Sequence, residues 1–203
     1  MMKKNQFWQY LVSAIALTLL ISDVASAHTG VGDTHGCLHG LTHPISGLDH
    51  ILAMVAVGLW AAQIGGKALW LVPSAFVLAM AGSSVWGHFG LPLPGVEPGI
   101  LASDFALGLL ILFAARLPLA ASMGIVGVLA VFHGYAHGAE MPETASGLTY
   151  GAGFILATAG LHLLGIGLGL AIERFQPILR QRLFRVGGAA VVLGAAYILV
   201  TSY

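Results

Sequence analysis

The chain has 203 residues, of which 58% are hydrophobic and only 8% are charged, and its formal net charge is zero. A soluble domain carries about a quarter charged residues, so this composition excludes a protein solvated on all sides. The balanced charge also provides no basic surface for nucleic acid. Apolar stretches near or above about 18 residues recur, and each is long enough to cross a lipid bilayer as a helix. The composition therefore predicts an all-α, polytopic membrane helix bundle.

The first 27 residues have the parts of a secretory signal peptide. Lys3 and Lys4 form a positive n-region, and the apolar segment 11–21 is short for a span. Residues 25–27 (Ala-Ser-Ala) provide the small residues of a cleavage site. We therefore predict a signal peptide over 1–27, with His28 as a mature N-terminus outside the cytoplasm. An uncleaved first transmembrane helix is the alternative.

Residues 28–43 form a glycine-rich arm that is dense in histidine. Short tracts of this kind commonly bind metal ions. The free amine of His28 and its imidazole would make a chelating pair once the signal peptide is removed. The other histidines of the arm are His35, His39 and His43. We predict an arm on the periplasmic side that captures metal; a flexible leader with incidental histidines is the alternative.

The remaining chain, within 28–203, reads as six transmembrane helices separated by turn and charge signals. The predicted spans are residues 44–63, 68–86, 99–115, 118–137, 146–172 and 184–201. With the mature N-terminus outside, the first, third and fifth connections face the cytoplasm. Those three connections hold every lysine and arginine of the mature chain, namely Lys67, Arg116, Arg174, Arg180, Arg182 and Arg185. This distribution satisfies the positive-inside rule and predicts a multi-pass protein of the bacterial inner membrane.

The first polar motif lies at the start of the first predicted span. Pro44 suits the first turn of a helix, where its missing N–H is no loss. His43 and His50 are seven residues apart, which predicts that they lie on one helical face, and Asp49 adjoins His50. Imidazole and carboxylate together suit nickel, cobalt or zinc. Polar capping of a helix end is the alternative.

The second motif lies at the end of the fourth predicted span. His133 and His137 are four residues apart and share a helical face, and Glu140 follows along nearly the same stripe. Two imidazoles and a carboxylate at this spacing predict half of a metal site. The alternative is a pair of buried histidines that are satisfied by backbone carbonyls, although ionisable groups inside a membrane usually mark a site or pathway.

Two further polar residues lie inside predicted spans. His162 is near the middle of the fifth span between glycines, where another helix packs closely, so it could reach the other histidines. The alternative is a core histidine with a local partner. Asp104, in the third span, is a candidate ligand or an acceptor that fixes a histidine tautomer. His88, at the end of the second span, could equally be an interfacial residue facing water.

Together these motifs resemble the HupE/UreJ family of nickel/cobalt permeases, over essentially the whole chain. The pattern HPxxGxDHxxxMxxVG is met by His43, Pro44, Gly47, Asp49, His50, Met54, Val57 and Gly58. The pattern FHGxAHGxE is met by Phe132, His133, Gly134, Ala136, His137, Gly138 and Glu140. A third, looser element is met by Gly160, Leu161, His162, Gly165 and Gly169. The resemblance implies uptake of nickel or cobalt in support of hydrogenase, urease or cobalamin synthesis.

We therefore predict a transporter, not an enzyme, that moves a divalent transition metal from periplasm to cytoplasm. The ion would be Ni²⁺ or Co²⁺, with zinc as a further candidate, and no P-loop for ATP hydrolysis is present. The main alternative is an intramembrane zinc-dependent hydrolase, since three histidines and an aspartate could hold zinc and activate water, although no HExxH motif occurs. A b-type haem protein and a membrane metal sensor are further alternatives.

Overall fold

The structure is a computed structural model that describes residues 36–141 and 147–202. Within these residues the fold is entirely helical. The helices are α2 (Gly36–Ser46), α3 (Leu48–Ile64), α4 (Ala68–His88), α5 (Val96–Leu112), α6 (Leu119–Ala139), α7 (Gly147–Glu173) and α8 (Pro177–Ser202). The predicted signal peptide, together with His28 and His35, lies outside the described residues.

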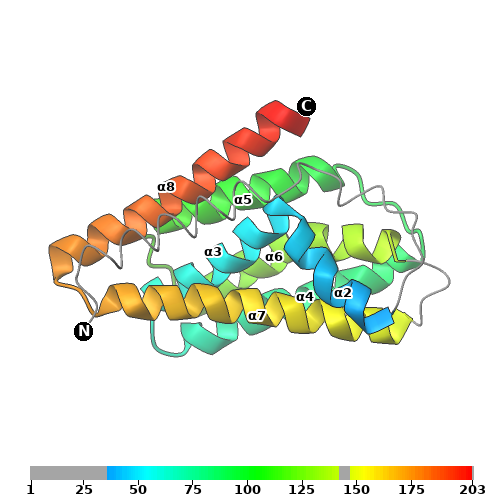
Figure 1. The fold of residues 1–203 in the computed structure, drawn as a ribbon, viewed down its shortest axis with the longest axis horizontal. Helices are drawn as coiled ribbons and strands as arrows, with labels where there is room; N and C mark the ends of the chain where they lie inside the picture. Colours follow the sequence, from blue (N-terminus) through cyan, green and yellow to red (C-terminus); the bar gives the residue numbers. More distant parts are fainter. Residues whose placement is uncertain (1–35, 142–146, 203) are drawn as a thin grey trace.

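The helices α3 to α8 run back and forth along the long axis of the molecule (Figure 1). The main packing pairs are α4 with α6, α3 with α7 and α5 with α8, while α2 packs against α7. The connections α3–α4, α5–α6 and α7–α8 lie at one end, on the left in Figure 1. We call this the basic end, because Lys67 and Arg116 lie in two of these connections and Arg174 in the third. The other end, where α6 finishes beside Glu140, we call the Glu140 end.

Several of these helices are suited to a membrane. The helices α4, α6, α7 and α8 are each long and apolar enough to cross one, and α2 with α3 makes a fifth candidate if the bent pair counts as one span. The helix α5 has 17 residues and a length of about 25 Å, somewhat less than the roughly 30 Å of a hydrocarbon core. The protein is therefore a multi-pass membrane helix bundle, and the count of six spans stays a prediction.

The structure corrects the expected first span, which is not one straight helix. Pro44 lies near the end of α2 instead of in a first turn, and α2 and α3 are bent by 82° at the break between them. Gly47 has an extended backbone, with φ −94° and ψ 125°, so the helical path stops there. The expectation that His43 and His50 share one helical face is therefore wrong. The described end of the arm, residues 36–43, is also helical and not a flexible leader.

The start of the last helix also differs from the expectation. We expected a connection that extends to Arg185, but α8 already begins at Pro177, a residue type favoured in a first turn. Arg180, Arg182 and Arg185 consequently lie in the first turns of α8. Arg180 donates a hydrogen bond of 2.9 Å from Nη1 to Glu173 Oε2 at the end of α7. These cations stay near the basic end of the bundle.

Glycines let the paired helices approach closely. A Cβ atom at Gly134 of α6 would overlap the carbonyl oxygen of Met80 in α4. On the other side of the bundle, Gly58 of α3 faces the carbonyl oxygen of His162, and Gly165 of α7 faces that of Val55. In each pair, one helix backbone rests directly on the other, as small residues permit in membrane bundles. These contacts set the spacing of the helices that carry the histidines.

Candidate metal site

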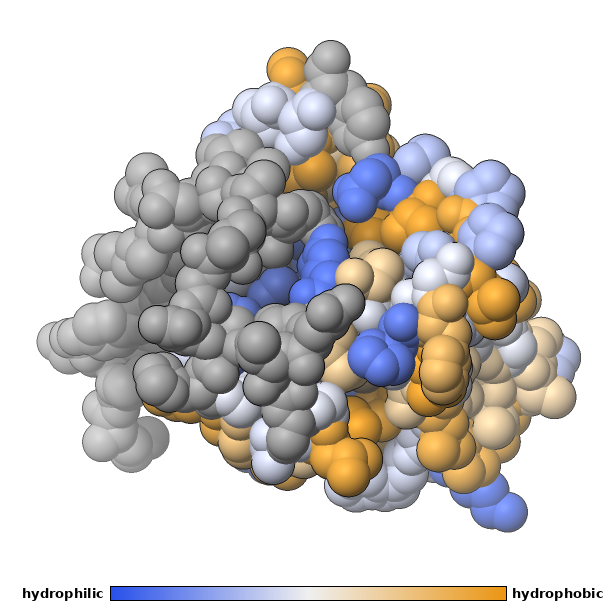
Figure 2. Space-filling view, turned by 90° about the vertical axis from the view of Figure 1, so that its right-hand side faces the viewer, coloured by the Kyte–Doolittle hydropathy of each residue, from blue (hydrophilic) through white to orange (hydrophobic). Residues whose placement is uncertain are grey.

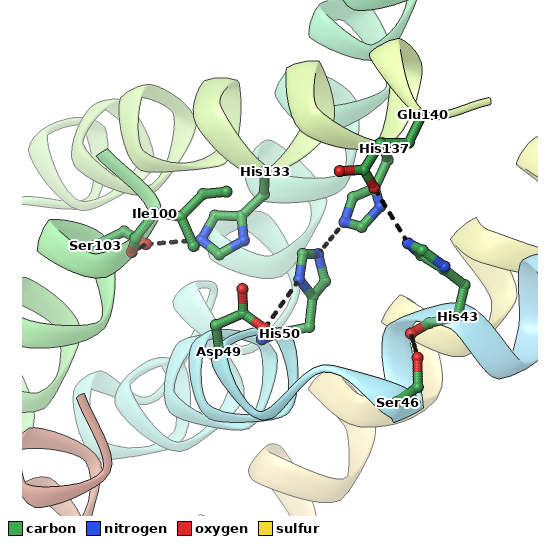
Figure 3. A network of polar contacts seen from close by, with 9 residues as sticks. All are labelled: His43, Ser46, Asp49, His50, Ile100, Ser103, His133, His137 and Glu140. Atoms are coloured by element: carbon green, nitrogen blue, oxygen red, sulfur yellow. Dashed lines mark hydrogen bonds and ion pairs between the residues drawn. The ribbon is translucent and has the colours of Figure 1, made fainter. Parts of the chain in front are cut away.

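Four histidines from three helices form a row near the Glu140 end (Figure 3). His43 comes from α2, His50 from α3, and both His133 and His137 from α6. The ring centres of His43 and His137 are 4.9 Å apart, those of His137 and His50 are 4.1 Å apart, and those of His50 and His133 are 4.8 Å apart. We call these four residues the histidine row. The break at Gly47 and the close packing of α2 on α7 let His43 reach it.

The centre of the row is the contact between His50 and His137. Their Nε2 atoms face one another at 2.5 Å, and both side chains are buried. A neutral imidazole has one N–H and one lone pair, so two nitrogens that face each other need a proton or a cation between them. Imidazole nitrogen is a good donor to divalent nickel, cobalt and zinc. This pair can therefore contribute two ligands to one ion.

His133, the most buried member of the row, has one nitrogen already engaged. Its Nε2 lies 2.7 Å from the hydroxyl oxygen of Ser103, and that hydroxyl donates its own hydrogen to the carbonyl oxygen of Ile100 at 2.6 Å. The network therefore assigns the ring hydrogen of His133 to Nε2, which donates to Ser103. This leaves a lone pair on Nδ1, which is buried and has no hydrogen-bond partner among the described residues. The sequence analysis missed Ser103. Its position next to Asp104, inside an apolar predicted span, could have indicated a polar site there.

Two carboxylates flank the row at different depths. Glu140 is 28% exposed, and its Oε2 lies 3.6 Å from Nε2 of His43. One ligand atom from each of His43, His137 and Glu140 lies within 4.8 Å of the other two, close enough to surround an ion. Asp49 accepts a 2.8 Å hydrogen bond from the backbone N–H of His50, and its Oδ1 lies 3.8 Å from Nδ1 of that ring. Glu140 thus lies at the partly exposed end of the row, and Asp49 lies beside its buried centre.

Aromatic side chains wall the row. Phe154 of α7 packs against His137 with ring centres 4.3 Å apart, and Phe76 of α4 packs against His133 at 5.8 Å. Apolar walls exclude water and strengthen the attraction between a cation and its ligands. A pocket between α4, α6 and α7 reaches the row. It is lined by residues that include Met80, Ser84, His137, Met141, Tyr150 and Phe154. Figure 2 views this end of the molecule, where hydrophilic residues are visible among the hydrophobic ones.

The remaining predicted residues do not join the row directly. His39 lies beyond it, with its ring centre 5.9 Å from that of His43. His162 packs against Phe76, whose ring centre is 5.4 Å from its own, and neither of its ring nitrogens has a hydrogen-bond partner among the described residues, so the expectation that it reaches the other histidines is not met. Asp104 is fully buried, and neither carboxylate oxygen has a hydrogen-bond partner in the part of the chain that the structure describes. It therefore does not fix a histidine tautomer there.

Fold and site together define a multi-pass helical membrane protein with a cluster of histidine and carboxylate side chains inside the bundle. A family model described as "HupE / UreJ protein" matches residues 15–198, and the chain belongs to this family. Protein HupE of Rhizobium leguminosarum bv. viciae is 48% identical over 189 residues, which cover 93% of this chain and 97% of the relative. No solved structure matches the chain.

Proposed function

We propose that the protein carries Ni²⁺ or Co²⁺ from the periplasm to the cytoplasm along the histidine row. The observation that carries this proposal is the convergence of four imidazoles from α2, α3 and α6 between apolar helices. Ionisable groups are expensive inside a membrane and usually mark a pathway or site. Membership of the HupE/UreJ family supports the same function.

The exposure of the donors orders the proposed path. His28, His35 and His39 of the arm first concentrate the hydrated ion. Glu140 and His43, which are partly exposed, then attract it and replace some of its water. His137 and His50 follow, with Asp49 beside them, and His133 supplies Nδ1 at the deepest point of the row. Neighbouring rings are within 5 Å of each other, so ligands can be exchanged one at a time.

The donor types also fit transport better than storage. Conduction requires binding that is strong enough to strip water from the ion and weak enough to release it. Imidazole and carboxylate meet that requirement, whereas a set of thiolates would hold these metals more tightly. The single cysteine, Cys37, is exposed on α2 and lies outside the row.

The proposed topology places the Glu140 end in the periplasm and the basic end in the cytoplasm. It requires that the signal peptide over 1–27 is removed and that α2 with α3, α4, α5, α6, α7 and α8 form six spans. The basic residues at one end support this orientation, because cytoplasmic connections are enriched in lysine and arginine. The helix α5 is at the lower limit of length for a span.

The decisive experiment is uptake of radiolabelled nickel and cobalt into liposomes that contain the purified protein. We expect saturable uptake that exceeds leakage into protein-free liposomes, and loss of that uptake in the His50→Ala variant. Lipid hydrolysis is assayed on the same preparation to test the zinc hydrolase alternative. Hydrolysis without metal uptake, in correctly folded protein, would reject the transport proposal.

A further inference from the structure

His162 is a buried histidine that the histidine row leaves unexplained. Its side chain is 2% exposed, and neither ring nitrogen has a hydrogen-bond partner within residues 36–141 and 147–202. One turn earlier on the same face of α7, Thr158 is fully buried, and its hydroxyl also lacks a partner among these residues. A helical threonine usually bonds to a carbonyl of the preceding turn, and buried polar groups are nearly always paired. Three polar atoms are thus available on one stripe of a helix.

This stripe continues the direction of the proposed path. Phe154, Thr158 and His162 follow one another at four-residue spacing along α7, so they share one face. Phe154 packs against His137 and His50 of the row. His162 therefore lies two turns, about 12 Å, further along α7 toward the basic end.

The ring of Phe76 contacts both His162 and the row. It packs edge-on against His162, with ring centres 5.4 Å apart, and against His133 at 5.8 Å. The centres of the two imidazoles are consequently no more than about 11 Å apart. Both imidazoles thus contact the same phenyl ring, and no hydrogen bond among the described residues joins His162 to the row.

The backbone of His162 is held in a close helix crossing. A Cβ atom at Gly58 of α3 would overlap the carbonyl oxygen of His162, and Gly165 makes the reciprocal contact with Val55. The side chain of His162 is buried, and this crossing fixes the position of its Cα atom. The unpartnered nitrogens are therefore held inside the bundle by the fold itself.

We propose that His162 and Thr158 form a second binding station for the transported divalent metal ion, separate from the histidine row and nearer the basic end. This inference rests on the proposed function. The station offers one imidazole and one hydroxyl, with water completing the coordination of the ion. So few protein ligands give weak binding, which suits a step from which the ion must leave.

Cobalt absorption in a cysteine variant tests whether the ion reaches this position. The native cysteine is removed by Cys37→Ala, and His162→Cys is added. We expect Co²⁺ to produce a thiolate-to-cobalt charge-transfer band in this protein and none in the Cys37→Ala parent. The matched control is Leu163→Cys in the same background, because Leu163 is the next residue of α7 but is 55% exposed; no band is expected there.

Adding His50→Ala to the His162→Cys protein tests whether the station is separate. A band that persists supports a second station, because His50 belongs only to the row. Loss of the band would mean that position 162 shares the ion with the row, which overturns the separation. Absence of any band in the His162→Cys protein would overturn the station altogether, whether or not the parent transports metal.

Transport by a His162→Leu variant gives the second test. We expect metal affinity at the row within about 3-fold of the parent, while initial uptake falls at least about 10-fold because the onward step is lost. Thr158→Val should cause a smaller loss. If His162→Leu takes up metal as fast as the parent protein, the station is overturned. It is also overturned if the folded variant loses both metal binding at the row and uptake. Should His162→Leu not fold, His162→Gln replaces it with the same expectations. Failure of the parent to take up metal would instead reject the proposed function.

Discussion

Gly134 lies between His133 and His137 on α6, and replacing it by alanine should open the contact with α4. A Cβ atom there would overlap the carbonyl oxygen of Met80 and lie 2.7 Å from its carbonyl carbon, whereas real Cβ atoms stay at least 3.0 Å from such neighbours. Because the obstacle is helix backbone, α4 and α6 must part by about 1 Å. Metal ligands tolerate displacements of only about 0.2 Å, and overpacking typically costs about 1–3 kcal/mol.

We therefore expect Gly134→Ala to lower the midpoint of thermal unfolding in detergent and to weaken nickel binding at least about 10-fold, or about 1.4 kcal/mol. Fluorescence-detected unfolding and equilibrium dialysis with radiolabelled nickel measure the two effects. The matched control is Gly124→Ala on the same helix, where a Cβ atom would meet nothing within 4 Å. Unchanged stability and nickel affinity in Gly134→Ala would refute the reasoning that the α4–α6 contact positions the histidine row.

Three further predictions address the site and its topology. His50→Ala and His133→Ala should each abolish metal uptake while the protein stays in the membrane, since each removes a buried donor. His88→Ala changes an exposed residue and should retain uptake. Full uptake in both the His50 and the His133 variant would reject the site. Asp104→Leu should raise the midpoint of thermal unfolding, because it removes two buried oxygens that have no hydrogen-bond partner among the described residues. Leaving such a buried polar group unpaired costs about 1–3 kcal/mol of stability. A lower midpoint there would contradict this account. N-terminal sequencing of the membrane-inserted protein should begin at His28, and a sequence that begins at Met1 would overturn the proposed topology.

Which residues share a face of one helix could be predicted from their spacing in the sequence. His133 and His137, four residues apart, do share a buried face of α6, because the helical period is a local property of the backbone. The same argument failed for His43 and His50, since it assumed one helix across Gly47. The spacing of seven residues holds only if the helix is unbroken, and Gly47 between the two histidines breaks it.

Composition and motif spacing thus determined the class of protein and its family, and they proposed the residue types of the candidate site. Which donors meet was decided by the tertiary structure. His43 reaches His137 because α2 bends by 82° from α3 and packs against α7. His162 instead packs against Phe76 of α4, which also contacts His133 of the row. Such relations depend on how closely helices far apart in the sequence approach one another, and contacts such as that of Gly134 with Met80 set that distance.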